Sequence, residues 1–240
     1  MVTDVAPHPA PFSESVLDAM RGVLATVSGV VLDPFAGVGG IHTLAHSGLT
    51  TVGVELEPEW ATAHPRTLRG DSRSLPFPDG AFDAIATSPA YGNRMADHHE
   101  AQERCRPCEG TGAVGGEGCS ACGGEGRREY RRITYRHTLG RALTDGNSGA
   151  MQWGEAYRTL HREVWQESVR VLKPGGLFVL NISDHVRGGK VMPVTAWHTS
   201  ALADLGVIWK YRLPVETPRM RYGQNSALRV SHEDVYVGVL

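Results

Sequence analysis

The feature of this 240-residue sequence that most restricts its fold is a repeated alternation of short apolar segments with segments of helical spacing. This alternation predicts a parallel sheet with helices on both faces, because a parallel crossover needs a connection about as long as a helix. The expected strands lie within 29–37, 50–56, 68–76, 82–89, 177–183, 207–215 and 233–240, and the expected helices are 15–24, 39–48, 58–64, 154–172 and 194–206. No helix separates the last two strands, which predicts an antiparallel hairpin at one edge of an otherwise mostly parallel, seven-stranded α/β sheet.

The alternation stops in residues 93–150, which are rich in glycine and arginine and show little apolar periodicity. We therefore expect three parts: a first half of the α/β domain in 1–92, a small insertion in 93–150, and the remainder of the domain in 151–240. The length is enough for one sizeable core with a small satellite module.

Composition restricts the partners and the cellular compartment that can be expected for this protein. The formal net charge is −2, so any nucleic-acid contact must come from a local basic patch. No stretch approaches the roughly 20 apolar residues that span a bilayer, and the N-terminus carries neither a basic leader nor an apolar signal core. We expect a cytoplasmic protein without membrane contact; monomer and homodimer both stay open.

All four cysteines fall within 18 positions, as two C-x-x-C pairs separated by ten residues. Four thiolates at this spacing predict a structural Zn²⁺ site, and a segment this small would take its folding energy from the metal. Each pair continues as C-x-x-C-x-G-x-G, which resembles one zinc unit of the cysteine-rich region of DnaJ-type chaperones. The expected ligands are Cys105, Cys108, Cys119 and Cys122.

A glycine-rich turn, "VLDPFAGVGG", joins the first expected strand to the segment after it. Gly37 and Gly39 let the backbone bend tightly and approach a ligand closely. Asp33 precedes the turn, Glu55 ends the second strand, and Asp71 follows the third at the same edge. Acids at this edge do not suit a pyrophosphate, but they suit an adenosine that carries a cationic amino-acid tail.

This run resembles the S-adenosylmethionine site of class I methyltransferases, and its D-P-F-x-G-x-G form is typical of enzymes that methylate amino groups in DNA. The resemblance implies a Rossmann-like class I methyltransferase fold. It also implies that Asp33 and the 37–39 loop hold the methionine part, Glu55 the ribose, Asp71 the adenine amine, and that Phe12 backs the ligand. The implied donor-binding residues are Phe12, Asp33, Pro34, Phe35, Ala36, Gly37, Gly39, Glu55, Asp71 and Ser72.

The fourth strand ends in Ser88-Pro89-Ala90-Tyr91, which resembles the [DNS]-P-P-[YFW] motif of the same family. An exocyclic amine is a poor nucleophile because its lone pair is delocalised into the ring. Acceptors at Ser88 and the Pro89 carbonyl would orient that lone pair, and Tyr91 would stack on a base turned out of its helix. The departure is Ala90, where the family usually has a second proline that stiffens the loop. Serine in the first position favours N4 of cytosine over N6 of adenine.

A basic run, "RREYRRITYRHTLGR" at 127–141, follows the cysteines and includes Tyr130 and Tyr135. Arginines neutralise phosphates and tyrosines stack on bases, so we expect double-stranded DNA to bind here. The expected contacts are Arg94, Arg127, Arg128, Tyr130, Arg131, Arg132, Arg136, Arg219 and Arg221.

The sequence thus favours a site-specific DNA methyltransferase, of the kind found in bacteria and phages and in restriction-modification systems, acting most readily on N4 of cytosine. Three alternatives stay open. These are N6-adenine methylation of DNA, guanine-N2 methylation of tRNA, and an inactive nucleic-acid-binding module built on the same fold.

Overall fold

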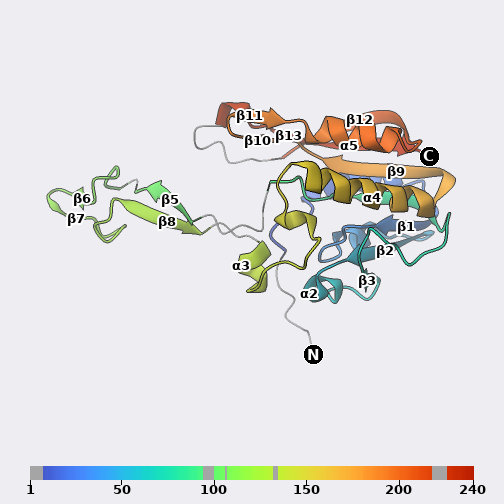
Figure 1. The fold of residues 1–240 in the computed structure, drawn as a ribbon, viewed down its shortest axis with the longest axis horizontal. Coiled ribbons are helices and arrows are strands. Elements are labelled where there is room, and N and C mark those ends of the chain that lie inside the picture. Colours follow the sequence, from blue (N-terminus) through green and yellow to red (C-terminus); the bar gives the residue numbers. More distant parts are fainter. Residues whose placement is uncertain (1–7, 94–99, 106, 132–134, 218–225) are drawn as a thin grey trace.

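The computed structural model describes residues 8–93, 100–105, 107–131, 135–217 and 226–240, with the backbone alone for 100–104, 128–131, 136, 137 and 226. Within these residues, seven strands form one sheet in the order β12-β13-β9-β4-β1-β2-β3 (Figure 1). The strands are β1 (Gly29–Asp33), β2 (Leu49–Glu55), β3 (Thr67–Arg69), β4 (Phe82–Thr87), β9 (Leu172–Ile182), β12 (Ile208–Glu216) and β13 (His232–Val239).

The pairing of the strands confirms the predicted sheet. β1 pairs in parallel with β2 and β4, and β4 pairs in parallel with β9. β13 runs antiparallel to both β9 and β12, so the last two strands form the expected hairpin at one edge. The chain order reverses between β1 and β4, and in open α/β sheets ligands bind at such a switch point.

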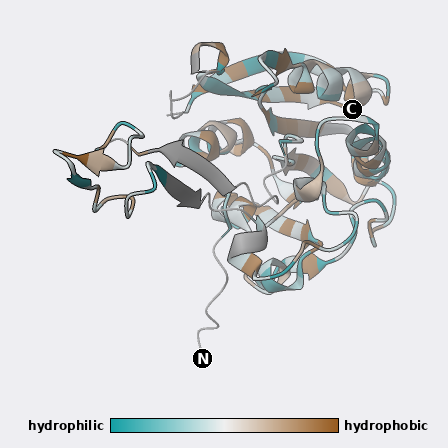
Figure 2. Cartoon of the chain, turned by 60° about the vertical axis from the view of Figure 1, so that its left-hand side comes forward, coloured by the Kyte–Doolittle hydropathy of each residue, from teal (hydrophilic) through white to brown (hydrophobic). Residues whose placement is uncertain are grey.

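Helices cover both faces of this sheet. In the part of the chain that the structure describes, the helices are α1 (Glu14–Leu24), α2 (Pro58–Ala61), α3 (Tyr135–Leu139), α4 (Glu155–Val171) and α5 (Val194–Ala203), with the short turns η1 (Gly40–Leu44), η2 (Ser148–Ala150) and η3 (Ser226–Leu228). α4 and α5 pack on one face of the sheet, and α1 packs on the other. The exposed helices show alternating hydrophobic and hydrophilic bands (Figure 2).

Neighbouring residues of the central strands point to opposite layers. In β1, Val31 packs toward α1 and Leu32 toward α4, and Val179 and Phe178 of β9 divide in the same way. All four side chains are fully buried, which explains why these strands read as continuous apolar runs.

Two expected helices are much shorter than the sequence predicts. Residues 39–48 form only the five-residue turn η1, because the buried His42 side chain bonds Thr51 and Thr67 of the sheet and holds the chain close to it. Residues 58–64 contain only the four-residue α2. Both segments are too short for a helix to add much stability of its own.

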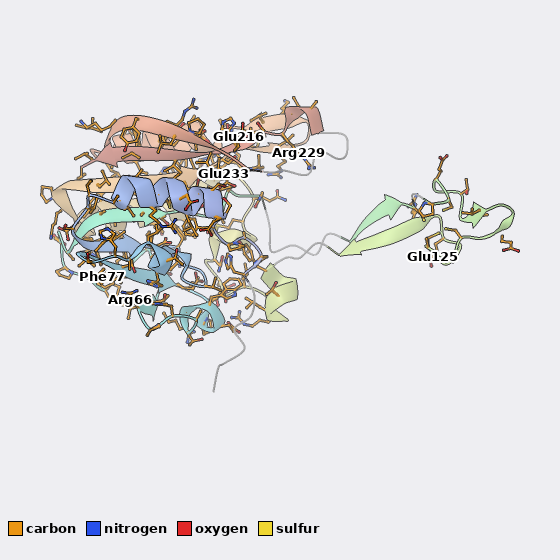
Figure 3. The ribbon with its side chains drawn as sticks, turned by 180° about the vertical axis from the view of Figure 1, so that it is seen from behind. Arg66, Phe77, Glu125, Glu216, Arg229 and Glu233 are labelled. Atoms are coloured by element: carbon orange, nitrogen blue, oxygen red, sulfur yellow. The ribbon has the colours of Figure 1, made fainter. Side chains whose placement is uncertain are left out.

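The insertion contains more regular structure than the sequence indicates. β5 (Glu100–Arg104) pairs with β8 (Arg127–Arg131), and between them β6 (Ala113–Val114) pairs with β7 (Glu117–Gly118). Figures 1 and 3 show this ladder and the cysteine-bearing turn, where Glu125 is labelled, extending away from the sheet. We call residues 100–131 the arm.

A second small hairpin joins β10 (His185–Arg187) to β11 (Lys190–Met192) just after β9. Among the described residues, no helix is both long and apolar enough to cross a membrane.

Candidate active site

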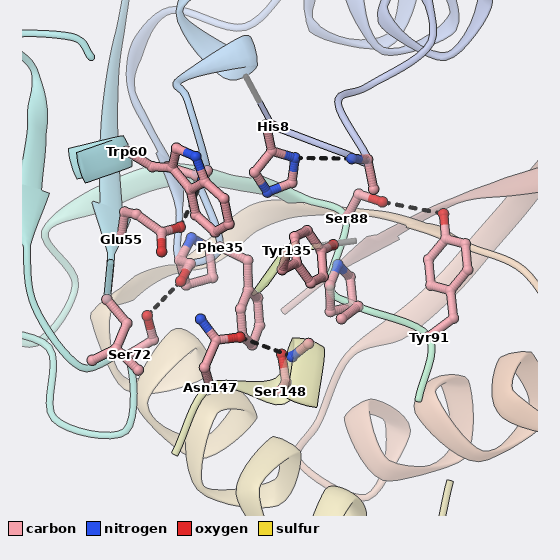
Figure 4. Close-up of a pocket in the computed structure, with 18 of the residues that line it drawn as sticks. His8, Phe35, Glu55, Trp60, Ser72, Ser88, Tyr91, Tyr135, Asn147 and Ser148 are labelled. Atoms are coloured by element: carbon pink, nitrogen blue, oxygen red, sulfur yellow. Dashed lines mark hydrogen bonds between the residues drawn. The ribbon is translucent and has the colours of Figure 1, made fainter. Parts of the chain in front are cut away.

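A cavity of about 350 Å³ opens at the carboxyl ends of β1, β2 and β4, at the switch point of the sheet. Its volume lies in the range of small-molecule sites. In Figure 4, Glu55 and Trp60 lie toward one end and Tyr91 toward the other, with Tyr135 between them. The lining residues predicted from the sequence are Phe12, Pro34, Phe35, Ala36, Gly37, Glu55, Asp71, Ser72, Ser88, Pro89, Ala90 and Tyr91.

The glycine turn is held against the end of β2. The Gly37 amide donates to Glu55 Oε2 at 2.8 Å, and the Glu57 amide donates to Glu55 Oε1 at 2.8 Å. Gly37 and Gly39 have φ of 51° and 86°, which is the left-handed region that favours glycine. Burial raises the pKa of Glu55 to about 7. The turn therefore presents a buried carboxyl group beside a backbone that a ligand can approach closely.

Asp33 and Gly39 are not among the residues that line the cavity. Asp33 is fully buried, and its Oδ1 accepts from the Phe35 amide at 2.9 Å and from Thr87 Oγ1 at 2.6 Å. Burial raises the Asp33 pKa to about 7. In this structure Asp33 ties the glycine turn to the end of β4, immediately before Ser88, instead of facing a ligand.

The segment after β3 supplies the third acid. Asp71 lies at the cavity wall and accepts from Arg73 Nη2 at 2.6 Å, which lowers the pKa of Asp71. The Ser72 hydroxyl donates to the Pro34 carbonyl and joins this segment to the glycine turn. Glu55 and Asp71 thus reach one cavity from neighbouring strands.

Residues 135–149, which we call the wall segment, close the same end of the cavity, although the sequence assigned them to the insertion. Tyr135 packs edge-on against Trp60, with ring centroids 5.5 Å apart, and His8 lies 4.5 Å from Trp60. Burial lowers the pKa of His8 to about 4, so this ring is neutral at physiological pH. Tyr135 is buried against the body and lines the cavity, so it does not lie on an exposed basic surface, and its stacking on a base stays a prediction.

Glu57 fastens the wall segment to the loop after β2. Its buried carboxylate accepts from Arg141 Nη2 at 2.6 Å, from the Thr144 amide and Asn147 Nδ2 at 2.8 Å, and from the Thr144 hydroxyl at 3.0 Å. Arg141 also pairs with Glu59. The last arginine of the basic run therefore anchors the wall segment. Sequence reasoning missed this contact because Glu57 and Arg141 are 84 residues apart.

The other end of the cavity carries a polar cluster around Tyr91. The Tyr91 hydroxyl donates to Glu233 Oε2 at 3.0 Å and lies 3.2 Å from Ser88 Oγ. Asn181 Nδ2 lies 3.0 Å from Ser88 Oγ and 2.8 Å from Glu233 Oε2. We missed Asn181 and Glu233 in the sequence. The position of Asn181 at the end of the strand beside β4 is a signal that could have indicated it.

The four cysteines come together at the end of the arm. Their sulfurs all lie within 4.8 Å of one another, with Cys105 and Cys119 Sγ 3.8 Å apart and Cys108 and Cys122 Sγ 3.7 Å apart. Four sulfurs about 2.3 Å from a tetrahedral Zn²⁺ lie about 3.8 Å from each other, so the residues fit this metal.

The glycines of the two C-x-x-C-x-G-x-G repeats have a steric reason. A Cβ on Gly112 would lie 2.2 Å from the Gly124 carbonyl oxygen, and one on Gly126 would lie 2.4 Å from the Gly110 carbonyl oxygen. The repeats also pair symmetrically, since the Gly110 and Gly124 amides donate to the carbonyls of Cys105 and Cys119. Backbone packing at this distance excludes any side chain.

Most of the expected DNA contacts fall where the structure gives little detail. Arg94, Arg132, Arg219 and Arg221 lie outside the described residues, and for Arg128, Tyr130, Arg131 and Arg136 only the backbone is described. Arg127 is exposed at the start of β8.

Comparison with protein-family models and with curated proteins finds no match to this chain. Solved structures do match. A chain from the complex of the Haloferax volcanii Trm112 methyltransferase activator with a candidate methyltransferase is 14% identical, with 94% of this chain and 88% of that chain covered and a TM-score of 0.53. A candidate S-adenosylmethionine-dependent methyltransferase from Listeria monocytogenes is 9% identical, with 94% and 96% covered and a TM-score of 0.50.

A third match, the cyclase SpnF, is 12% identical, with 97% of this chain and 85% of that chain covered and a TM-score of 0.50. The matches show the Rossmann-like class I methyltransferase fold. Because one protein with this fold is described as a cyclase, the fold leaves the reaction open, and the reaction must be argued from the site.

Proposed function

We propose that this protein transfers a methyl group from S-adenosylmethionine to the exocyclic amine of a nucleobase in DNA, with N4 of cytosine as the first candidate and N6 of adenine as the next. One observation carries the proposal: residues 34–37 of the glycine turn, Glu55, Asp71 and the Ser88–Tyr91 motif line a single cavity. Bound there, the donor would supply an electrophilic methyl group on a sulfonium.

The residues present fit this donor. Glu55 and Asp71 offer carboxylate oxygens to ribose hydroxyls and to an adenine amine, while Trp60, Phe35 and Tyr135 supply apolar surface. Gly37 adds no side chain of its own to the cavity wall, and the His8 ring lies beside the position that a Cβ there would take. Asp33 holds the turn in register with β4 and contributes to donor binding only through the backbone that it orders.

At the acceptor end, Ser88 Oγ and the Pro89 carbonyl accept hydrogen bonds from the amine and direct its lone pair toward the donor. The Tyr91 ring faces the base. Its hydroxyl is already held by Glu233 and lies beside Ser88, so the ring orientation is set before the acceptor arrives. Such preorganisation lowers the barrier without a covalent nucleophile.

We assign the zinc-bound arm to DNA binding, with the phosphate contacts on the basic residues of β8 and α3. Residues 107–126 of the arm carry Glu109, Glu117 and Glu125 and no lysine or arginine, whereas Arg104 and Arg106 flank Cys105 on the side where the chain enters the arm. Phosphate contacts therefore belong nearer to the body, where Arg127 and its basic neighbours stand.

Guanine N2 in RNA is a second candidate, and Glu233 favours it. A carboxylate beside Ser88 and Tyr91 suits guanine, which presents N1–H and the N2 amine as adjacent donors. Cytosine and adenine present a ring-nitrogen acceptor beside the amine, which a carboxylate would repel. The identity of the methylated nucleoside distinguishes these candidates.

The test is incubation with labelled S-adenosylmethionine and double-stranded DNA, single-stranded DNA or tRNA, followed by digestion and mass spectrometry of the nucleosides. N4-methylcytosine or N6-methyladenine supports the proposal, and N2-methylguanine supports the second candidate. Donor binding by calorimetry without methylation of any nucleic acid would contradict both and favour the inactive module.

Ser88→Ala tests the assignment of roles. We expect turnover to fall by about 10- to 100-fold while the donor dissociation constant changes little, because Ser88 lies at the acceptor end. Ser47→Ala, an exposed serine far from the cavity, is the matched control. If Ser88→Ala abolishes donor binding instead, the two ends of the cavity have been assigned wrongly.

A further inference from the structure

The backbone carbonyl of Ala90 accepts a hydrogen bond from a buried side chain on another element. The hydroxyl of Tyr157, in the first turn of α4, lies 2.6 Å from the Ala90 oxygen. Tyr157 is fully buried, whereas Ala90 lies at the wall of the cavity between Pro89 and Tyr91. The contact therefore joins the helix layer to the loop that carries the proposed acceptor residues.

This tyrosine is the last member of a chain of three buried side chains. Trp165 Nε1 donates to His198 Nδ1 at 3.0 Å, and His198 Nε2 lies 2.8 Å from the Tyr157 hydroxyl. Each of the three side chains is fully buried. Trp165 and Tyr157 come from α4, and His198 comes from α5.

Donor and acceptor chemistry allows one direction along the chain. The indole of Trp165 can only donate, so His198 Nδ1 is the acceptor and its Nε2 must carry the proton. That proton goes to the Tyr157 oxygen, and the single Tyr157 proton goes to the Ala90 carbonyl. Burial lowers the pKa of His198 well below its ordinary value and raises that of Tyr157, so both stay neutral at physiological pH.

The loop beyond Ala90 is held from the same side. The Trp153 amide donates to the Gly92 carbonyl at 2.7 Å, and a Cβ on Gly92 would lie 3.0 Å from the Trp153 nitrogen. Alanine leaves φ free where a proline would fix it, so the conformation at residue 90 must be fixed by contacts from outside the loop.

We propose that Trp165, His198 and Tyr157 are positioning residues, which fix the Ala90 carbonyl and thereby hold Ser88 and Tyr91 in place for the acceptor. The inference rests on the proposed function for its effect on turnover. The hydrogen-bond chain itself can be tested without activity.

Tyr157→Phe removes one hydroxyl and keeps the ring, and Tyr211→Phe makes the same change on the exposed face of β12 as a control. For Tyr157→Phe we expect kcat to fall about 10- to 100-fold with the donor dissociation constant within about twofold, because a small misplacement of reacting groups is costly. Amide exchange at 90–92 should accelerate, while the exchange of the central strands stays unchanged. Full turnover with unchanged exchange at 90–92 would overturn the proposal.

Imidazole ¹⁵N spectra of the wild-type protein report the tautomer of His198 directly. This measurement needs neither a variant nor a methyl acceptor. We expect His198 in the Nε2–H form and neutral at physiological pH, because burial lowers its pKa well below the ordinary value. An Nδ1–H form would overturn the chain, even if methyl transfer is observed. If the wild type methylates no nucleic acid, the proposed function fails, while the spectra and the exchange at 90–92 still decide whether the chain positions the loop.

Discussion

Glu57→Gln is the sharpest test of the idea that the wall segment belongs to the donor end of the cavity. The Glu57 carboxylate is fully buried and accepts four hydrogen bonds from residues of the wall segment. Glutamine keeps one acceptor oxygen and replaces the other with a donor. In one orientation the new NH2 group would face the Arg141 guanidinium, and in the other it would face the Thr144 amide and Asn147 Nδ2. Because all of these groups are donors, each orientation leaves part of the wall segment without an acceptor.

The size of the expected effect follows from the hydrogen-bond partners that Glu57 would lose. Breaking a buried ion pair costs about 3–5 kcal/mol. The Arg141 side chain is 35% exposed, so water and Glu59 recover part of that loss. We therefore expect the docking of the wall segment to weaken by about 2 kcal/mol, roughly 30-fold in its equilibrium constant. This is the upper limit for the rise in the donor dissociation constant.

Glu59→Gln is the matched control, because Glu59 contacts the same arginine but is itself 37% exposed. An exposed pair is worth at most about 1 kcal/mol, so donor affinity should change by only a few-fold. Calorimetry with S-adenosylmethionine and amide exchange over 138–149 would measure both variants. Equal donor affinities for the two variants, or unchanged exchange in Glu57→Gln, would refute the role given to the wall segment.

Three further predictions concern the metal, the glycine turn and pH. Cys108→Ser, or a chelator, should remove one zinc per chain and speed amide exchange in the arm while the central strands keep their protection, which metal analysis and exchange together would check. Gly37→Ala should weaken donor binding about 10-fold, because φ is 51° and the new Cβ would lie 3.2 Å from His8 Nε2. Gly22→Ala is the control, since a Cβ there meets open space. Equal donor dissociation constants for the two variants would contradict this prediction. Asp33 and Glu55 have their pKa raised by burial from 3.8 and 4.5 to about 7, so their contribution to the free energy of unfolding is fully present below about pH 4 and is lost as pH rises through about 7. Asp33→Asn should flatten that loss in urea denaturation across pH, and a profile parallel to the wild type would show the reasoning to be wrong.

The sequence alone determined where the strands lie along the chain, the mostly parallel pairing with an antiparallel edge hairpin, and the edge at which Glu55, Asp71 and the Ser88–Tyr91 motif meet. Parallel strands buried on both faces must be apolar throughout, and a crossover must contain a helix-length segment, so these features are local and visible in the sequence. The cysteine spacing was equally informative, because a small metal unit draws all its ligands from one short stretch. The acids at the strand ends and the Ser88–Tyr91 motif could also be expected at one edge, because the carboxyl ends of parallel strands lie at the same edge of a sheet.

What the tertiary structure decided depends on contacts between distant residues. Glu57 and Arg141 meet across the insertion, Tyr135 packs on Trp60, and Tyr157 reaches the Ala90 carbonyl from a different layer. Nothing in the local pattern separates an arginine that binds phosphate from one that pairs with a buried glutamate, since both lie in the same basic run. Likewise, the sequence predicts that Asp33 faces a ligand, but in the structure its carboxylate is buried and accepts from Thr87 Oγ1 at 2.6 Å. Only the pairing of β1 with β4 brings these two residues together.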